Sequence, residues 1–333
     1  MTQLLNQMSF FLVIQHVVRF DLRALFVAAA YFYHEIVVKG QKCTSNAKLH
    51  GKTVVVTGSN TGIGKRTAVD LAKRGARVIM ACRSRERGER AMEDVKRESG
   101  SNNVAFMPLD LASLKSVRNF AESYIKSEQR LDILINNAGL YMEGRTEDGF
   151  GLMFGVNHLG HFLLTNLLLQ RLKESAPSRV VNVSSVAHNF GHIDFDCLHQ
   201  HKALGTGNSF RQLMQIYSDS KLCNVLFTHE LHKRLQGTGV TCYSLHPGAI
   251  NSEFDRNMNR VLVLFMKPIT SFFFKSPEQG CQTSLHCTLQ EALEPLSGRY
   301  FSNCTARNVF AKARDDATAK KLWELSESMS GLV

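Results

Sequence analysis

The sequence has few of the features that mark metal-binding, secreted or disordered proteins. Its eight cysteines are scattered, without a CxxC pair or a paired Cys/His spacing, so neither a zinc site nor a disulfide framework is expected. Such cysteines suit reduced thiols in a cytosol-facing protein, which makes secretion a less favoured interpretation. Only 6 of the 333 residues are proline and 44% are hydrophobic, which argues against disorder and allows a substantial buried core.

No single basic block accounts for the formal net charge of +11. The stretch from Arg83 to Arg97 is interleaved with acidic residues, as on a solvated helix face, and no zinc-finger, homeodomain or RNA-recognition signature appears. Nucleic acid is therefore not an expected partner. The excess charge suits an anionic membrane surface or a phosphorylated cofactor.

The chain opens with two apolar runs, Met8 to Val18 and Ala24 to Val38, each shorter than the ~20 apolar residues of a spanning helix. Lysines follow the second run as far as Lys48, which fits a signal anchor or an interfacial helix with a cytoplasmic catalytic domain. A cleaved signal peptide and a buried N-terminal helix are the alternatives. We therefore expect a hydrophobic anchor with a basic linker over 1–48 and a catalytic domain over 49–333.

A strand, a glycine loop and a helix follow this segment. Thr53–Val56 is a short β-branched run, and the loop from Thr57 to Gly64 leads into a helical pattern that continues through Arg74. The glycines would let the backbone approach a pyrophosphate, and the helix N-terminus would supply N–H groups, although glycines after a strand can also make a simple turn. The cofactor-binding residues expected in this loop are Gly58, Ser59, Asn60, Thr61, Gly62, Ile63 and Gly64.

The next strand-like stretch, Arg77 to Cys82, ends at Arg83. An NAD-selective site would place an acidic residue near this point to bind the ribose 2′-hydroxyl, whereas an arginine suits a 2′-phosphate. NADP(H) is therefore expected in preference to NAD(H). Lys65 would either assist or be an ordinary surface lysine.

Helical and strand-like stretches continue to alternate along the chain. Alternation of this kind indicates parallel βαβ units, so the predicted fold is α/β, a Rossmann-type doubly wound parallel sheet of seven strands in a single domain. The remaining strands are predicted at 104–109, 131–135, 179–183, 240–245 and 299–302, and helices at 85–98, 113–128, 278–290 and 316–329.

Small and polar residues follow several of the predicted strands. Ligands bind at the carboxyl ends of the strands in such sheets, so these residues are expected to border the cofactor. They are Asp110, Leu111, Asn137, Ala138, Gly139, Pro247 and Gly248.

A tyrosine and a lysine one helical turn apart, Tyr217 and Lys221, form the candidate acid–base pair. Residues at i and i+4 share a helix face, and a cation beside a tyrosine favours the phenolate that can act as a base near neutral pH. Asn157, within an otherwise apolar helix, and Ser185, after the fifth strand, are expected at the same sheet edge.

In combination these motifs strongly resemble the short-chain dehydrogenase/reductase family. The resemblance runs from about Lys52 to Cys304 and includes the glycine loop, Asn136–Gly139, Asn157, Ser185, the Tyr217/Lys221 pair and Pro247–Gly248. Ala81-Cys82-Arg83 and Ser220-Lys221-Leu222 look like the retinol dehydrogenase branch of that family.

The resemblance implies roles for four catalytic residues. Tyr217 would exchange a proton with the substrate oxygen, and Lys221 would favour the phenolate and hold the ribose, so both would also contact the cofactor. Ser185 would donate a hydrogen bond to the substrate oxygen, while Ser184 faces the other side of the strand. Asn157 would position a water behind Lys221 for proton relay.

The segment between Ser185 and Tyr217 is longer than in most of the family, with Asn189 to Arg211 inserted, as in the retinol dehydrogenase branch. We interpret it as a loop near the substrate mouth. Its histidines are expected to be surface or loop residues, without a metal role: His188, His192, His199 and His201.

The segment from Asn251 to Pro277 is irregular in period and contains two apolar runs, Val261–Met266 and Phe272–Phe274. They suggest a lid for a greasy substrate or a second membrane contact, with plain core packing as the alternative. The substrate-loop regions are then about 187–212 and 249–277.

The expected function is NADP(H)-dependent interconversion of an alcohol and a carbonyl on a lipophilic, retinoid- or steroid-like substrate. The alternative is a membrane-tethered NADP(H)-binding scaffold with little catalysis. A membrane-associated location is expected, at the endoplasmic reticulum with the catalytic domain facing the cytosol. The sequence is compatible with a homo-oligomer.

Overall fold

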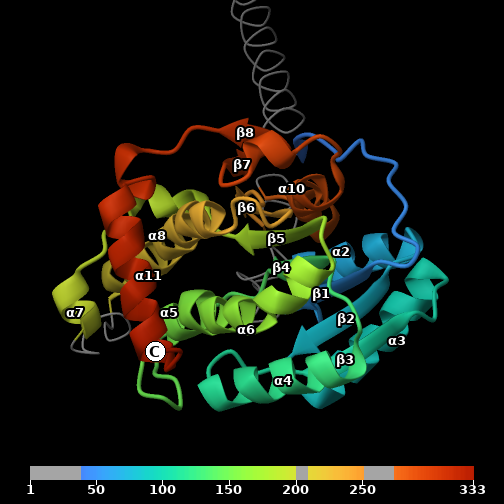
Figure 1. Cartoon of the computed structure of the whole chain (residues 1–333), viewed down its shortest axis with the longest axis horizontal. Coiled ribbons are helices and arrows are strands. Elements are labelled where there is room, and N and C mark those ends of the chain that lie inside the picture. The colour runs from blue at the N-terminus through green and yellow to red at the C-terminus, as the bar shows by residue number, and fades with distance from the viewer. Residues whose placement is uncertain (1–38, 200–208, 251–273) are drawn as a thin grey trace, which may run out of the picture.

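The computed structural model describes residues 39–199, 209–250 and 274–333 (Figure 1). The predicted anchor as far as residue 38, residues 200–208 of the predicted insertion and residues 251–273 of the expected lid lie outside the described residues.

A single sheet of eight strands organises the described residues, in the order β3-β2-β1-β4-β5-β6-β7-β8. The first seven strands in this order pair in parallel, which confirms the predicted Rossmann-type sheet. The strands are β1 Thr53–Thr57, β2 Arg77–Cys82, β3 Val104–Pro108, β4 Ile133–Asn136, β5 Ser178–Val183, β6 Val240–His246, β7 Tyr300–Ser302 and β8 Thr305–Arg307.

The short strand β8, antiparallel to β7, was not predicted. It follows a turn in which Asn303 and Cys304 have positive φ angles, and its three residues are too few to show a period of two. The prediction of seven strands was therefore one strand short.

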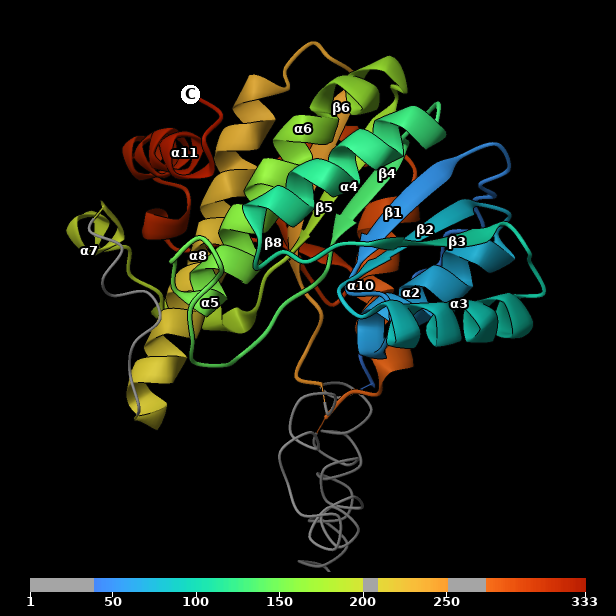
Figure 2. The same cartoon turned by 90° about the horizontal axis from the view of Figure 1, so that it is seen from below.

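Helices cover both faces of the sheet, as Figure 2 shows. Val54 and Val56 of β1 pack with α2, α3 and α10, whereas Val55 packs with α4, α6 and α8 on the other face. The helices are α2 Gly62–Lys73, α3 Arg85–Ser99, α4 Leu114–Ser127, α5 Leu152–Phe154, α6 Gly160–Glu174, α7 Phe195–His199, α8 Phe210–Arg234, α10 Pro277–Leu289 and α11 Asp316–Ser330.

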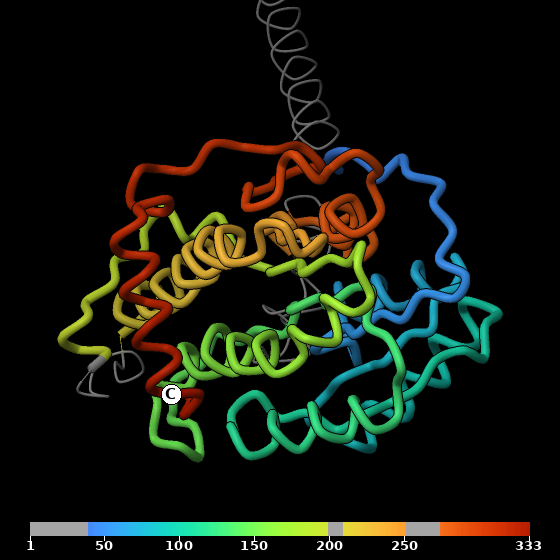
Figure 3. The backbone as a smooth tube through the Cα atoms, viewed as in Figure 1, coloured from blue at the N-terminus to red at the C-terminus, as the bar shows by residue number. Residues whose placement is uncertain are grey.

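The helical stretch from Leu152 to Glu174 includes α5, a π-helical turn at Gly155–Leu159 and α6. In the described part of the chain it is the one helix long and apolar enough to cross a membrane, but 78% of its most apolar window is buried inside the fold. Its apolarity is therefore explained by core packing. Near the C-terminus, α11 packs beside α8 (Figure 3). Its Trp323 ring meets the Phe162 ring of α6 at a centroid distance of 4.9 Å.

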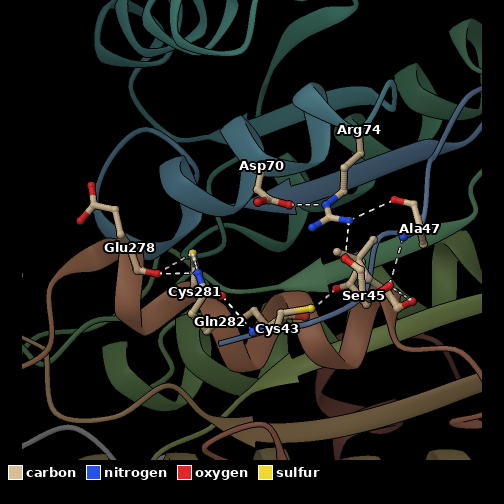
Figure 4. A network of polar contacts seen from close by, with 11 residues as sticks. Cys43, Ser45, Ala47, Asp70, Arg74, Glu278, Cys281 and Gln282 are labelled. Carbon is tan, nitrogen blue, oxygen red and sulfur yellow. Dashed lines mark hydrogen bonds and ion pairs between the residues drawn. The ribbon is translucent and has the colours of Figure 1, made fainter. Parts of the chain in front are cut away.

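Hydrogen bonds attach the end of the predicted linker, residues 43–47, to the folded domain (Figure 4). The Arg74 guanidinium at the end of α2 donates hydrogen bonds to the carbonyls of Ser45 (2.8 Å) and Ala47 (3.1 Å). The Cys43 amide donates to the Gln282 side chain on α10 at 3.0 Å, and Leu49 lies in the core. The chain therefore joins the folded domain before residue 49.

Candidate active site

The site lies at the carboxyl ends of the parallel strands, where the strand order reverses between β1 and β4. After β1 the chain goes to β2 and β3 on one side, and it then returns to β4 on the other side of β1. Loops at such a switch point diverge and leave a crevice that binds ligands in doubly wound sheets.

The glycine loop after β1 has backbone geometry that a side chain would disturb. Gly58 has a φ of +64°, and a Cβ there would lie 2.9 Å from the Ala138 Cα. A Cβ on Gly64 would lie 2.6 Å from the Gly58 carbonyl oxygen. The loop therefore needs glycine at both positions to close against the segment after β4.

Helix α2 presents an uncapped N-terminus at this loop. Its N-cap, Thr61, makes no side-chain cap hydrogen bond, and its first turn holds no acidic residue. Unpaired N–H groups and the positive end of the helix dipole favour an anion here. The Ser59 hydroxyl instead turns inward to the Val56 carbonyl at 2.9 Å, so Ser59 offers only its backbone to a ligand. With the close approach of Gly58 and Gly64, this arrangement fits the pyrophosphate of a dinucleotide.

Thr57 joins the glycine loop to the segment after β4. Its hydroxyl accepts the backbone N–H groups of Asn137 and Ala138, both at 2.9 Å. The Asn137 amide nitrogen donates in return to the Thr57 carbonyl at 2.8 Å. The two loops predicted to contact the cofactor are thus held together by one threonine.

His161 completes this connection from α6. Its Nδ1 lies 3.2 Å from the Asn157 carbonyl and its Nε2 lies 2.9 Å from the Thr57 hydroxyl. Because the carbonyl can only accept, Nδ1 carries the proton and Nε2 accepts from Thr57. Burial lowers the pKa of His161 to about 3, with Lys221 acting in the same direction, so the imidazole is neutral. Sequence analysis missed Thr57 and His161, although His161 lies one turn beyond Asn157 on the same helix face.

The two basic residues considered for the 2′-phosphate differ in their surroundings. Arg83 follows β2 and is exposed at the sheet edge. The Lys65 ammonium instead lies 2.7 Å from the Asp94 carboxylate on α3. Of the two, Arg83 is therefore the side chain that can turn toward a ligand.

The other predicted cofactor residues lie at the same edge. The Asp110 carboxylate accepts the Ala112 N–H at 3.0 Å, and the Leu111 carbonyl would be 2.7 Å from a Cβ on Gly160. Beyond β6, Pro247 is buried, and Gly248 has a φ of +100°, with Lys275 across it.

Asn157 lies in the π-helical turn before α6 and is fully buried. Its side chain exchanges two hydrogen bonds with the Leu140 backbone, accepting at 2.9 Å and donating at 3.0 Å, and it also donates to the Ser220 hydroxyl at 3.0 Å. The side-chain amide is thus engaged with protein groups, and the backbone carbonyl accepts the His161 Nδ1 proton at 3.2 Å. π-Helical turns occur frequently at functional sites.

Tyr217 and Lys221 lie on α8, as predicted. The Lys221 ammonium is 5.6 Å from the Tyr217 ring centroid and donates to the Val183 carbonyl at 3.3 Å. A Cβ on Gly139 would lie 3.2 Å from the Lys221 ammonium. Because Gly139 is exposed and has no side chain, it leaves the sheet edge over the buried lysine uncovered. The Tyr141 ring meets Tyr217 edge to face at a centroid distance of 5.6 Å.

Ser184 and Ser185 face different surroundings. The Ser184 hydroxyl is buried and donates to the Lys221 carbonyl at 2.7 Å. Ser185 is partly exposed, and its hydroxyl accepts the Ala187 N–H at 3.2 Å, which leaves its own proton to be donated elsewhere. This arrangement agrees with the expectation that the second serine faces the site.

The prediction that His188 is a surface or loop residue was wrong. It lies in a 3₁₀ turn at Val186–Phe190, is 2% exposed, and packs on the Tyr300 ring at a centroid distance of 4.6 Å. Its Nδ1 donates to the Ser185 carbonyl at 2.7 Å, and burial lowers its pKa. A single histidine in an inserted segment gave no periodic signal of burial. His192 is exposed, His199 ends α7, and His201 lies outside the described residues.

The chain is similar to known proteins over most of its length. Residues 52–196 match the profile of the short chain dehydrogenase family, and the chain is 53% identical to bovine dehydrogenase/reductase SDR family member 13, over 92% of this chain and 81% of the relative. The chain belongs to the short-chain dehydrogenase/reductase family. It is therefore a member of a family of oxidoreductases, and the predicted resemblance is confirmed.

Other relatives include retinol dehydrogenases. The chain is 52% identical to mouse retinol dehydrogenase 12 over 88% of this chain and 90% of the relative. It is 51% identical to human retinol dehydrogenase 11 over 87% of this chain and 89% of the relative.

Solved structures have a similar fold. An uncharacterized protein from Mycobacterium paratuberculosis is 34% identical, with a TM-score of 0.68 over 88% of this chain and 98% of the other. Pseudomonas aeruginosa RhlG, solved as an active-site complex with NADP, is 26% identical, with a TM-score of 0.57 over 77% of this chain and 95% of the other.

Proposed function

We propose that the protein is an NADP(H)-dependent oxidoreductase that interconverts an alcohol and a carbonyl on a lipophilic substrate. The observation that carries this proposal is the buried Lys221 ammonium, 5.6 Å from the Tyr217 ring at the carboxyl edge of the sheet. A cation in this position stabilises a phenolate, which a proton acceptor for an alcohol requires. Membership of an oxidoreductase family supports the same chemistry.

In this proposal Tyr217 gives its phenolic proton to the substrate oxygen during reduction and takes it back during oxidation. Ser185 donates its hydroxyl proton in a hydrogen bond to the same oxygen, where negative charge develops. Lys221 keeps the phenolate stable, and Asn157 keeps Lys221 in place through Ser220 and positions the relay water. NADP(H), when bound, supplies or accepts the hydride.

The cofactor would be held by the loop from Gly58 to Gly64, by the ends of the neighbouring strands, and by the Tyr217/Lys221 pair. Arg83 would select the 2′-phosphate, because a guanidinium matches the geometry of phosphate oxygens. The NADP complex of RhlG supports NADP(H) as the cofactor class. The strand-end residues in this proposal are Asp110, Leu111, Asn137, Ala138, Gly139, Pro247 and Gly248.

A lipophilic, retinoid- or steroid-like substrate is supported by apolar side chains beside the pair. Phe190 is 72% exposed and Phe210 is 76% exposed, and the Phe190 carbonyl accepts a hydrogen bond from Gln215, half a turn before Tyr217. Val186 and Met142 are also exposed, next to Ser185 and Tyr141 respectively. The names of the retinol dehydrogenase relatives agree with a substrate of this class.

We further propose that residues 1–48 attach the domain of 49–333 to the endoplasmic reticulum membrane, with the active site facing the cytosol. The apolar runs and their flanking lysines support attachment, and the eight free cysteines suit a reducing compartment.

Activity measurement with a panel of retinoid, steroid and short-chain carbonyls tests the proposal, with NADPH and NADH compared in detergent. We expect turnover with NADPH and a loss of about a thousandfold in kcat for Tyr217→Phe. Tyr243→Phe is the matched control, because Tyr243 is a fully buried core residue of β6. NADPH binding without turnover across the panel would favour a membrane-tethered scaffold, and unchanged turnover in Tyr217→Phe would rule out the proposed mechanism.

A further inference from the structure

The segment after Ser185 lies directly on α8. A Cβ on Gly191 would be 2.6 Å from the Ser218 carbonyl oxygen, so the two backbones touch at this point. The Gln215 side-chain amide donates to the Phe190 carbonyl at 3.1 Å. The Lys312 ammonium, from the turn before α11, donates to the Gly191 carbonyl at 2.8 Å.

Asp219 of α8 also holds this segment. One of its carboxylate oxygens accepts both the His192 N–H and the Gln215 side-chain amide, each at 2.7 Å. Asp219 is only 7% exposed, and no ion pair within 4.0 Å is formed by it in the described part of the chain. Burial raises its pKa, and the charged groups that face it are His192 and Lys312. Burying a carboxylate costs free energy unless hydrogen bonds compensate for the lost water. Asp219 therefore favours the backbone conformation in which the His192 N–H donates to it.

The chain is therefore attached to α8 both before and after Ser185. On one side the Ser184 hydroxyl donates to the Lys221 carbonyl at 2.7 Å, and on the other side His192 donates to Asp219. Between them the His188 imidazole donates to the Ser185 carbonyl at 2.7 Å. The two α8 residues that make these attachments, Asp219 and Lys221, lie within four residues of Tyr217 on its C-terminal side.

We propose that Asp219 is a positioning residue, which clamps the segment from Ser185 to His192 onto α8 and thereby sets the position of Ser185 relative to Tyr217. The proposal rests on the proposed function, because it assumes that both hydroxyl groups act on one substrate oxygen. A displacement of about 1 Å between such groups can reduce turnover by up to about a hundredfold.

Two substitutions at Asp219 distinguish the effect of its hydrogen bonds from the effect of its charge. Asp219→Asn keeps an oxygen that can accept both hydrogen bonds, whereas Asp219→Ala removes it. We expect Asp219→Ala to lower kcat for retinaldehyde reduction about tenfold or more, with little change in the KM for NADPH, and Asp219→Asn to remain within about twofold of wild type. Asp196→Ala is the control, since Asp196 is an exposed carboxylate in the same inserted segment.

Hydrogen exchange measures the clamp without relying on turnover. Peptides covering 186–198 should exchange faster in Asp219→Ala than in wild type, and at the wild-type rate in Asp219→Asn and Asp196→Ala. Gln215→Ala, at an exposed position, should show a smaller effect of the same kind and serves if Asp219→Ala does not fold.

Wild-type kcat and wild-type exchange in Asp219→Ala, or in Gln215→Ala where it must serve, would overturn the proposal. Equal loss of kcat in Asp219→Asn and Asp219→Ala would also overturn it, because the charge would then matter and the clamp would not. If wild type reduces no carbonyl, the proposed function fails, and the exchange data still decide whether Asp219 holds the segment.

Discussion

The side-chain amide of Asn157 donates a hydrogen bond of 3.0 Å to the hydroxyl of Ser220, the residue directly before Lys221. The same side chain holds the Leu140 backbone through two further hydrogen bonds. A single buried asparagine thus connects the loop after β4 with the helix that carries Tyr217 and Lys221.

Asn157→Ala should therefore reduce both stability and turnover. The substitution removes the side-chain partner of the Leu140 N–H and carbonyl, which costs about 1–3 kcal/mol in the free energy of unfolding for an unsatisfied group. It also removes the hydrogen bond to Ser220, whose hydroxyl keeps only its bond to the Tyr217 carbonyl, so displacement of Lys221 should lower kcat at least tenfold. Asn166→Ala is the control, because Asn166 lies on α6 and donates to the Phe162 carbonyl within the helix. Urea unfolding and steady-state kinetics check both effects, and equal kcat values for the two variants would contradict the assigned connection.

Gly58→Ala should weaken the cofactor site more than an equivalent change elsewhere. Gly58 and Gly237 both have positive φ, +64° and +77°, but a Cβ at Gly58 would lie 2.9 Å from the Ala138 Cα and one at Gly237 would meet nothing within 4 Å. Both substitutions carry the left-handed strain of roughly 1–2 kcal/mol, and only Gly58→Ala also forces the two loops apart. Thermal unfolding and NADPH titration should show a larger loss of stability, and a loss of affinity, in Gly58→Ala alone. Similar NADPH affinity in both variants would show that loop contact at Gly58 is not needed for binding.

Arg83→Ala should change cofactor selectivity. Loss of a charge-assisted hydrogen bond costs about 1.5–3 kcal/mol, which corresponds to roughly 10- to 100-fold weaker NADPH binding, while NADH binding should stay nearly constant. Arg85→Ala is the matched control, since Arg85 is exposed and pairs with Glu89 at 3.1 Å. Affinities for the two cofactors can be measured by fluorescence titration. An equal loss for NADPH and NADH would assign Arg83 a role other than recognition of the 2′-phosphate.

Stability should fall as the pH decreases below about 6.5, because buried histidines remain neutral in the fold. Burial lowers the pKa of His158 to about 3, and its Nε2 lies 3.0 Å from the Ser326 hydroxyl. The unfolded chain binds a proton near the ordinary pKa and the folded chain does not, so acid stabilises the unfolded state over the interval between these values. His158→Gln should make the decrease in unfolding free energy between about pH 7 and about pH 5 shallower, by up to about 1.4 kcal/mol per pH unit. An unchanged decrease in His158→Gln would exclude His158 as a source.

The sequence determined the α/β alternation, the glycine loop and the residues predicted for catalysis, because each depends on a local pattern. The Tyr217/Lys221 spacing places both residues on one helix face, and the β-branched run at Val54–Val56 could be recognised as a buried strand without knowledge of its neighbours.

Only the tertiary structure decided which side chains hold these elements in place. Thr57 contacts His161 and the loop after β4, and Asp219 contacts His192, because chain folding brings residues distant in sequence within hydrogen-bond distance. His188 became buried for the same reason, since the Tyr300 ring that covers it belongs to β7. Side-chain periodicity reports which face of an element is apolar, and it carries no information about the polar partner that meets a residue from another element.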